Sequence, residues 1–597
     1  MRNKKFRACG SPLLTIVLCI TTLAQSVSVS MLDKTCQPCD DFYKYANGGW
    51  LKNNTIPPTQ AAWSRSNEII ERTNLILREI LEESAGKKNR AKGGSEQLIG
   101  SYYAACADEA KIEADGAKAL APVLARIEKI KNVGDLQGEI VNFHRLGVPA
   151  LFGFGASPDI KNSGMIIGAI RQGGISLPNR DYYTEAKFAP VRENFVKHVA
   201  AMFALLGDDA AKAESAAKTV LAVQTQLAES SRTPLQLRDS NASYNKRTMA
   251  QLKELTPNFD WANYFSGRGA PPMTEVNVGQ PEFFERMNGL LTSVPINDWK
   301  TYLRWHLVSS AAARLSSPFV NENFDFYGRK MTGQKEQSPR WKRCMAATDG
   351  ALGDALGEIY VKRAFTPESK RRMQELIGNL LAAYRERLST VEWMSDATRR
   401  EALAKLDALK QKIGFPDKWD AYPGLVVKPD AYLENAFRVN DYLVKKNLAK
   451  IGKPVDRAEW LMTAPTFNAY YYAPNNEIVF PSGFLQPPMF DPKAEDAANY
   501  AAVGAVIGHE ITHGFDDKGS TFDAAGNLRN WWTDVDRKNF TDRAACIEKQ
   551  YSAFEVENGL FINGKLTLGE NIGDMGGLYT AYNAYRKSLE GKPKPPV

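Results

Sequence analysis

The stretch His509-Glu510-Ile511-Thr512-His513 holds two of the five histidines of this chain, four residues apart, with a glutamate directly after the first. On an α-helix, side chains at i and i+4 lie on the same face, one above the other. Both imidazoles can therefore reach one tetrahedral Zn²⁺, while Glu510 projects about 100° around the helix, towards a water molecule on the metal. The alternative is a helix whose two histidines are solvated or hydrogen-bonded in the core and bind no metal.

A site of this kind needs a further ligand, because catalytic zinc usually has three protein ligands and one open position. A histidine six residues after His513 is excluded, since Gly519 occupies that position. A glutamate from a later helix is another possibility, and residues 568–577 contain Glu570 and Asp574 at the i, i+4 spacing. One carboxylate can bind the metal while the other accepts a hydrogen bond from a ligand histidine. A solvated helix face is the alternative, but the flanking residues are mostly apolar, and a metal would account for charge in such surroundings.

Several segments of the chain resemble the neprilysin family of zinc metallopeptidases, peptidase family M13, and they occur in the order of that family. The most specific are residues 506–532, residues 569–577 and Asn468-Ala469-Tyr470-Tyr471. Further similar segments run through most of the chain, at residues 38–43, 48–50, 177–183, 478–483 and 485–488.

The resemblance implies a zinc metalloendopeptidase that carries one Zn²⁺ per chain. The ligands that it implies are His509, His513 and Glu570. It also implies that Glu510 is the general base and that Asp574 orients a ligand histidine. Asp516 is a further candidate for supporting the site, although Asp516 and Asp517 could equally cap the turn after the motif.

The length of the chain, 597 residues, exceeds what one hydrophobic core supports, so two or more lobes are expected. The hydrophobic content of 44 % and the charged content of 24 % are those of an ordinary globular protein. No basic run with interleaved aromatic residues is present, so nucleic acid is not an expected partner.

The expected fold is mainly α-helical with small β elements. The resemblance implies a thermolysin-like catalytic lobe and a large helical lobe, which together enclose a central cavity. Linker-like stretches at residues 86–95 and 414–429 suggest the boundaries. The expected parts are a signal peptide (1–24), an N-terminal piece of the catalytic lobe (30–85), an inserted helical lobe (86–429) and the zinc-binding part of the catalytic lobe (430–597).

The N-terminus has the organisation of a secretory signal peptide. Basic residues between Arg2 and Arg7 precede an apolar run from Leu13 to Ala24, and small or polar residues follow. The run is about 12 residues long, whereas a membrane-spanning helix needs about 20. We therefore expect export to a periplasmic or extracellular location without stable membrane insertion. The alternative is an uncleaved N-terminal membrane anchor, which some members of the family have.

Export would place the cysteines in an oxidising compartment. The resemblance implies a disulfide between Cys106 and Cys344, within the helical lobe. Cys39 and Cys546 match positions whose partners in the family lie near the C-terminus, beyond the end of this sequence. Cys36 forms a C-x-x-C pattern with Cys39, which by itself is weak evidence for a redox or zinc pair.

Local patterns predict two helices and a pair of strands. Thr366-Pro367-Glu368 has the residues of a capped helix start, and a second helix is expected to begin near Asp396. Residues 470–472 and 478–480 are rich in aromatic and β-branched side chains, with a turn predicted at Pro474-Asn475-Asn476. An exposed edge strand beside the histidine helix can bind an extended peptide through main-chain hydrogen bonds.

The resemblance also suggests how a peptide is bound. Asn468 would contact the peptide backbone through its side-chain amide, and Ala469 would offer its carbonyl oxygen. The alternative for Asn468 is a residue that only ends a turn. Phe484, Met489 and Val506 match positions of the family's pocket for a large apolar residue just after the scissile bond. A helical lobe covering this site would restrict substrates to oligopeptides.

In the family, a histidine and an arginine beyond the third ligand help to stabilise charge in the transition state. No histidine follows His513 in this sequence, which ends at Val597, so we expect the family's last region to be missing. Two functions follow as hypotheses. The first is an exported zinc metalloendopeptidase, favoured by the intact Glu510. The second is a catalytically impaired fragment that binds zinc and peptides without turnover.

Overall fold

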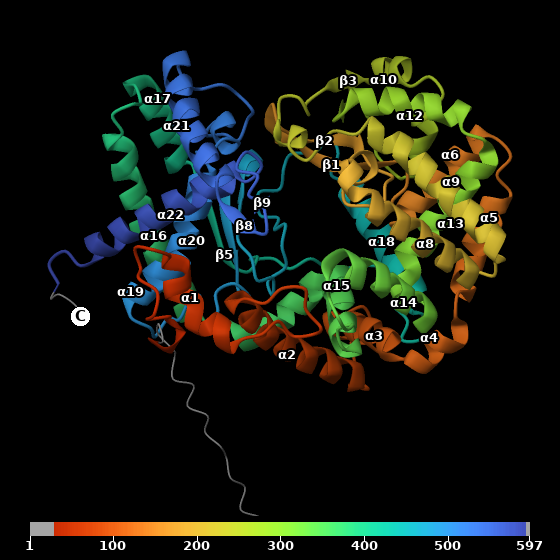
Figure 1. Cartoon of the computed structure of the whole chain (residues 1–597), viewed down its shortest axis with the longest axis horizontal. Helices are drawn as coiled ribbons and strands as arrows, with labels where there is room; N and C mark the ends of the chain where they lie inside the picture. Colours follow the sequence, from red (N-terminus) through yellow and green to blue (C-terminus); the bar gives the residue numbers. More distant parts are fainter. Residues whose placement is uncertain (1–28, 593–597) are drawn as a thin grey trace, which may run out of the picture.

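The computed structural model describes residues 29–592, which form two lobes joined by a helical bundle (Figure 1). The predicted signal peptide, residues 1–24, lies outside the described residues. None of the helices within residues 29–592 combines the length and the apolar character that crossing a membrane requires. The mainly helical, two-lobed architecture expected from the sequence is confirmed.

The helical lobe, on the right in Figure 1, has its own hydrophobic core, which runs from Leu120 to Phe326 and is closed by Leu433. It contains a four-stranded sheet in the order β1-β2-β4-β3. Its helices are α5 (Ala121–Glu128), α6 (Val133–Leu146), α7 (Asp181–Thr184), α8 (Ala189–Leu205), α9 (Ala210–Glu229), α10 (Met249–Leu255), α11 (Trp261–Gly267), α12 (Pro281–Ser293), α13 (Ile296–Ala311), α14 (Ser317–Asn323) and α18 (Tyr432–Leu448). Its strands are β1 (Phe152–Asp159), β2 (Asn162–Gln172), β3 (Lys246–Thr248) and β4 (Glu275–Val278).

The C-terminal lobe, on the left in Figure 1, has a second core that runs from Met373 to Ala584. A three-stranded sheet in the order β5-β7-β6 lies within it, and β8 pairs with β9 in a separate hairpin. Its helices are α16 (Pro367–Thr390), α17 (Asp396–Asp407), α19 (Asp496–Asn499), α20 (Ala505–His513), α21 (Asp534–Ser552) and α22 (Leu568–Ser588). Its strands are β5 (Lys410–Gly414), β6 (Tyr470–Tyr472), β7 (Glu477–Pro481), β8 (Glu555–Glu557) and β9 (Leu560–Phe561).

A third core belongs to the bridging bundle, which we define as α2, α3 and α15. These helices run along the lower edge of Figure 1 and connect the two lobes. The bundle and its neighbours are α1 (Phe42–Asn53), α2 (Arg65–Gly86), α3 (Ser95–Ala107), α4 (Glu109–Asp115) and α15 (Arg340–Ala364).

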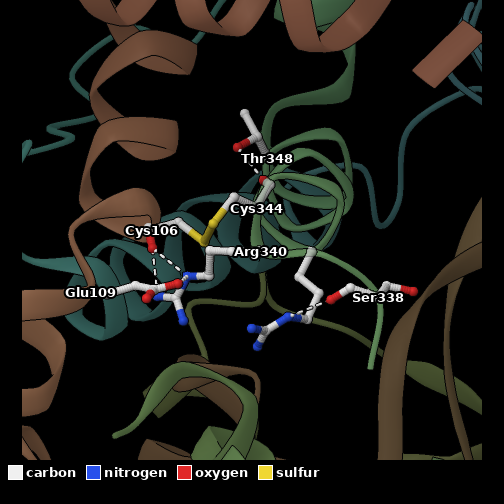
Figure 2. The surroundings of a disulfide bond; sticks show 7 residues. Cys106, Glu109, Ser338, Arg340, Cys344 and Thr348 are labelled. Carbon is white, nitrogen blue, oxygen red and sulfur yellow. Dashed lines mark hydrogen bonds and ion pairs between the residues drawn. A yellow bond between two sulfur atoms is a disulfide. The ribbon is translucent and has the colours of Figure 1, made fainter. Parts of the chain in front are cut away.

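A disulfide ties α3 to α15, as expected for Cys106 and Cys344 (Figure 2). Arg340 strengthens the same contact, because its guanidinium donates to the Cys106 carbonyl oxygen at 3.0 Å through Nε and at 2.5 Å through a terminal nitrogen. Thr348, one turn after Cys344, donates its hydroxyl to the Cys344 carbonyl oxygen at 2.8 Å. The bond therefore lies in the bridging bundle and not in the helical lobe proper. Among the described cysteines, Cys36, Cys39 and Cys546 are free.

The expected division of the chain at residue 429 does not follow the packing. Helices α16 and α17 and strand β5 precede that residue, yet their apolar side chains belong to the core of the C-terminal lobe. Helix α18 follows it, yet packs on α6 and β1 of the helical lobe. Arg145 and Asp441 form an ion pair of 2.8 Å across this contact. The proline- and glycine-rich stretch 414–429 is thus a crossing between lobes, and the chain passes between them more than once.

The local predictions within the C-terminal lobe are confirmed. Helix α16 starts after Thr366, whose side chain accepts a hydrogen bond from the Ser369 backbone N–H, and Pro367 occupies its first turn. Helix α17 begins at Asp396. The two predicted strands are β6 and β7, paired antiparallel around the turn, and β6 is the edge of its sheet.

Replacement of both Cys106 and Cys344 by alanine should lower the free energy of unfolding of the bridging bundle by about 2–4 kcal/mol, because the disulfide closes a long loop. Thermal and urea denaturation of the variant and the wild type measure this difference. Cys546→Ala is the matched control, since this cysteine is free and exposed. Equal shifts in the two variants would show that the disulfide does not hold the bundle.

Candidate metal centre

Helices α20 and α22 make the closest helix contact in the C-terminal lobe, and glycines at the contact allow it. A Cβ atom on Gly577 would lie 2.4 Å from the Ala505 carbonyl oxygen, and one on Gly508 would lie 2.8 Å from the Gly577 carbonyl oxygen. A Cβ atom on Gly573 would meet the His509 ring at 2.8 Å. Real Cβ atoms do not approach other atoms this closely. Residues without side chains therefore let the two backbones touch and bring α22 against the histidines.

Three side chains from these two helices converge on one point. Ring and carboxylate atoms of His509, His513 and Glu570 all lie within 4.8 Å of one another. The Glu570 Oε2 atom is 3.4 Å from Nε2 of His509 and 3.6 Å from Nε2 of His513. Two imidazoles and one carboxylate form a ligand set used by catalytic zinc, with a fourth position left for water or substrate. The chemistry of the donors thus fits zinc.

Each histidine is oriented from behind by a second carboxylate. Asp574 Oδ1 lies 2.8 Å from Nδ1 of His509, and Asp516 Oδ2 lies 2.8 Å from Nδ1 of His513. Both contacts leave Nε2 facing Glu570, as a metal ligand requires. The Asp574 side chain is 72 % exposed and that of Asp516 only 6 % exposed, so the second contact is the better shielded from solvent. Of the two roles open to Asp516, contact with the histidine is the one observed, and it also caps the turn by accepting from the Gly519 backbone N–H at 2.6 Å.

The electrostatics of the cluster favour a cation at its centre. Burial lowers the pKa of both histidines, but hydrogen bonds to Asp574 and Glu570 raise the pKa of His509 to about 9, and hydrogen bonds to Asp516 and Glu570 raise that of His513 to about 10. Hydrogen bonds from the two rings hold the pKa of Glu570 far below its usual range. The carboxylates thus stabilise positive charge here, and a metal ion has to compete with protons for the rings.

Glu510 lies on the inner side of the same helix and is only 6 % exposed. Burial raises the pKa of its carboxyl, while the neighbouring histidines and the Tyr471 backbone N–H act in the opposite direction. The glutamate therefore lies between the donor cluster and edge strand β6. A carboxyl with a raised pKa at that position can take up and release a proton during a reaction.

The loop after α20 is held by a buried lysine that the sequence patterns did not single out. Lys405, on α17, is 1 % exposed and donates its three ammonium hydrogens to the carbonyl oxygens of Gly514, Gly519 and Phe522, at 2.6, 2.7 and 2.7 Å. Burial lowers the pKa of Lys405 to about 7, against the attraction of nearby aspartates. Because this loop carries Asp516, Lys405 fixes the residue that orients His513.

The helical lobe also reaches this loop. Arg238 forms an ion pair of 2.6 Å with Asp517, which directly follows Asp516. Ser163, at the start of β2, adds two hydrogen bonds. Its hydroxyl donates to the Ala525 carbonyl oxygen at 2.7 Å, and its backbone N–H donates to Asn527 Oδ1 at 2.8 Å. The two lobes are thus in contact next to the donor cluster.

The residues expected to bind a peptide lie next to strand β6 or in the apolar core of the C-terminal lobe. Asn468 is exposed and Ala469 is 7 % exposed, and both directly precede edge strand β6. Phe484, Met489 and Val506 share one apolar cluster, in which Phe484 is 4 % exposed and the other two are partly buried. Ala469 and Phe484 therefore belong to the same hydrophobic core of the C-terminal lobe, against which Met489 and Val506 pack.

Of the residues selected for the site from the sequence, the structure brings His509, His513, Glu570, Asp574 and Asp516 together in the donor cluster, and Asn468 and Ala469 directly precede strand β6. The sequence did not single out three other parts of the structure that support the donor cluster, namely the glycines of α22, Lys405 and Arg238. The glycines had a visible signal, because Gly573 and Gly577 have the spacing of a small-residue helix contact. Lys405 had none, since one lysine among leucines looks like a solvated position of an amphipathic helix.

The helix motif, the later glutamate and the buried general-base candidate define the class of zinc metallopeptidases. The chain belongs to peptidase family M13, whose two models match residues 38–416 and 468–597. The Locusta migratoria endothelin-converting enzyme homolog is 34 % identical over 96 % of this chain and 82 % of its own length. Rat endothelin-converting enzyme 1 is 34 % identical over 95 % of this chain and 77 % of its own length.

Solved structures agree with the lobe arrangement. The Mycobacterium tuberculosis zinc metalloprotease Zmp1 in complex with an inhibitor matches with a TM-score of 0.93 and 38 % identity, over 96 % of this chain and 88 % of that one. The same protein in an open state matches with a TM-score of 0.75, over 94 % of this chain and 88 % of that one. The two lobes described here are therefore arranged more as in the inhibitor complex.

Lys405→Met should lower the free energy of unfolding by about 2 kcal/mol or more, because buried carbonyl oxygens then lack donors. Amide hydrogen exchange in residues 514–522 should become faster in the same variant. Lys538→Met provides the control, since Lys538 is exposed on α21, where it forms an ion pair with Asp542. Unchanged exchange in the loop would show that Lys405 does not hold it.

Proposed function

We propose that this chain is an exported metalloendopeptidase that binds one Zn²⁺ through His509, His513 and Glu570 and hydrolyses oligopeptides. The observation that carries the proposal is the convergence of these three donors beside the buried carboxyl of Glu510. Zinc in this site would polarise the scissile carbonyl group and lower the pKa of a bound water molecule. Proton transfer, orientation of the imidazoles and binding of the peptide are carried out by side chains and backbone groups of the protein.

Glu510 acts as the general base and then as the general acid. It takes the proton of the attacking water and passes it to the leaving amine. The raised pKa of Glu510 supports this role, because a carboxyl that binds a proton more readily can hold it between the two transfers. Asp574 and Asp516 keep the two imidazoles oriented and do not transfer protons themselves.

The peptide binds along strand β6, with Asn468 and Ala469 contacting its backbone. The exposed amide of Asn468 and the free edge of the β5-β7-β6 sheet support this assignment. The apolar cluster around Phe484 favours a large apolar side chain just after the scissile bond. Contacts between the lobes beside the donor cluster limit access, which favours oligopeptides over folded proteins.

Glu510→Gln should reduce kcat for an oligopeptide by about 10²-fold or more while zinc content is unchanged, because shape is kept and the base is lost. Steady-state kinetics on an internally quenched peptide, with metal analysis of both proteins, measure the effect. Retained activity in the variant would contradict the proposed role of Glu510. A wild-type protein that binds zinc and peptide without cleaving the peptide would instead support the alternative function.

Export should remove the N-terminal segment after Ala24, as the small residues around this position suggest. Expression with the native N-terminus, followed by mass spectrometry of the exported protein, should give a chain that begins at Gln25. A membrane-bound product that keeps residues 1–24 would contradict cleavage and identify an anchor.

A further inference from the structure

A cavity of about 340 Å³ opens between α2, α15 and residues 465–467. Its walls are mostly apolar, with Ile70 and Leu77 on α2, Met345 on α15 and Phe467 on the third side. Among the described residues that line it, Asp349 on α15 is the only charged one. The cavity therefore combines an apolar wall with a single carboxyl group.

The cavity lies next to the proposed path of the peptide. Residues 465–467 directly precede Asn468 and Ala469, which we propose bind the peptide backbone. The Phe467 ring packs against the ring of Phe484 with 5.2 Å between centroids, so the cavity and the apolar cluster share a wall. An extended peptide advances about 3.3 Å per residue. If one side chain of the bound peptide packs against Phe484, a side chain only a few residues along the same peptide can therefore reach the cavity.

Asp349 is held in place but has no cationic partner among the described residues. Its Oδ1 atom accepts a hydrogen bond of 3.4 Å from the hydroxyl of Thr463, which also lies 3.0 Å from the hydroxyl of Thr466. Burial raises the pKa of the Asp349 carboxyl to about 6, and the bond from Thr463 opposes this rise. An ionised carboxylate in such surroundings is stabilised by a neighbouring positive charge.

The helix that carries Asp349 is rigidly positioned. Cys344 lies five residues earlier on α15, and its disulfide to Cys106 ties the helix to α3 (Figure 2). A carboxylate on a rigidly held helix can discriminate between ligands, because it cannot shift to accommodate a ligand that lacks a matching positive charge.

We propose that this cavity is a subsite for a lysine or arginine side chain of the peptide substrate. The aliphatic stem of such a side chain packs against Ile70, Leu77 and Met345, and its charged end binds the carboxylate of Asp349. The inference rests on the proposed function and adds a second selected position to the preference for a large apolar residue.

The test is a positional scan of internally quenched peptides that carry one large apolar residue and, at each neighbouring position in turn, Lys, Gln or Glu. Wild-type protein should cleave the Lys peptide with a kcat/KM about tenfold above that of the Gln peptide at one position, the effect of one charge-assisted hydrogen bond. Asp349→Asn should reduce this ratio to about one, chiefly by lowering kcat/KM for the Lys peptide. Asp349→Lys should favour the Glu peptide at the same position.

Two controls make the outcome specific. Asp417→Asn removes a carboxylate that is 99 % exposed, and it should leave the ratio unchanged. The dissociation constants of the Lys and Gln peptides are also measured on Glu510→Gln protein, with and without Asp349→Asn, so that discrimination is read without turnover. Equal affinity and equal kcat/KM for the two peptides at all positions would overturn the subsite. Discrimination by Asp349 in binding, without hydrolysis by the wild type, would instead contradict the proposed function and keep the subsite.

Discussion

The close contact between α20 and α22 is the constraint on which the site depends. An HExxH helix supplies two imidazoles and a base, but it cannot supply the third donor. That donor comes from a helix whose backbone touches the first, with Gly508 facing Gly577. A Cβ atom at Gly508 or Gly577 would lie only 2.8 Å or 2.4 Å from a backbone oxygen of the other helix, so the two helices would have to move apart. Such a shift would disturb the distances of 3.4 Å and 3.6 Å between Glu570 and the two rings. The geometry of the donors is thus set by residues that bind nothing themselves.

A second level of support acts on the loop after α20. Lys405 satisfies three backbone carbonyl oxygens of that loop, and the loop in turn presents Asp516 to His513. Arg238 reaches Asp517 from the other lobe. The position of the helical lobe is therefore coupled to the residues that orient one ligand.

The parts of this fold that the sequence predicts are those with a short-range signal. The i, i+4 pairs placed His509 with His513 and Glu570 with Asp574, and capping residues placed the starts of α16 and α17. Contacts between distant residues left no such signal. Lys405 is 109 to 117 residues from its acceptors, so nothing in its local sequence distinguishes it from a solvated lysine. The proline- and glycine-rich stretch before residue 429 has a related limit: it marks a crossing between lobes, but it does not show which core the flanking helices join.

Metal analysis of purified protein under chelator competition tests the central claim, that α20 and α22 together build one zinc site. The account predicts about one zinc per chain in the wild type. Glu570→Ala should lose its zinc at a chelator concentration that the wild type withstands. Asp574→Asn should bind zinc with an affinity about 10- to 100-fold weaker than that of the wild type. Zinc retained equally by the wild type and Glu570→Ala would contradict the account, because the third donor would then come from elsewhere.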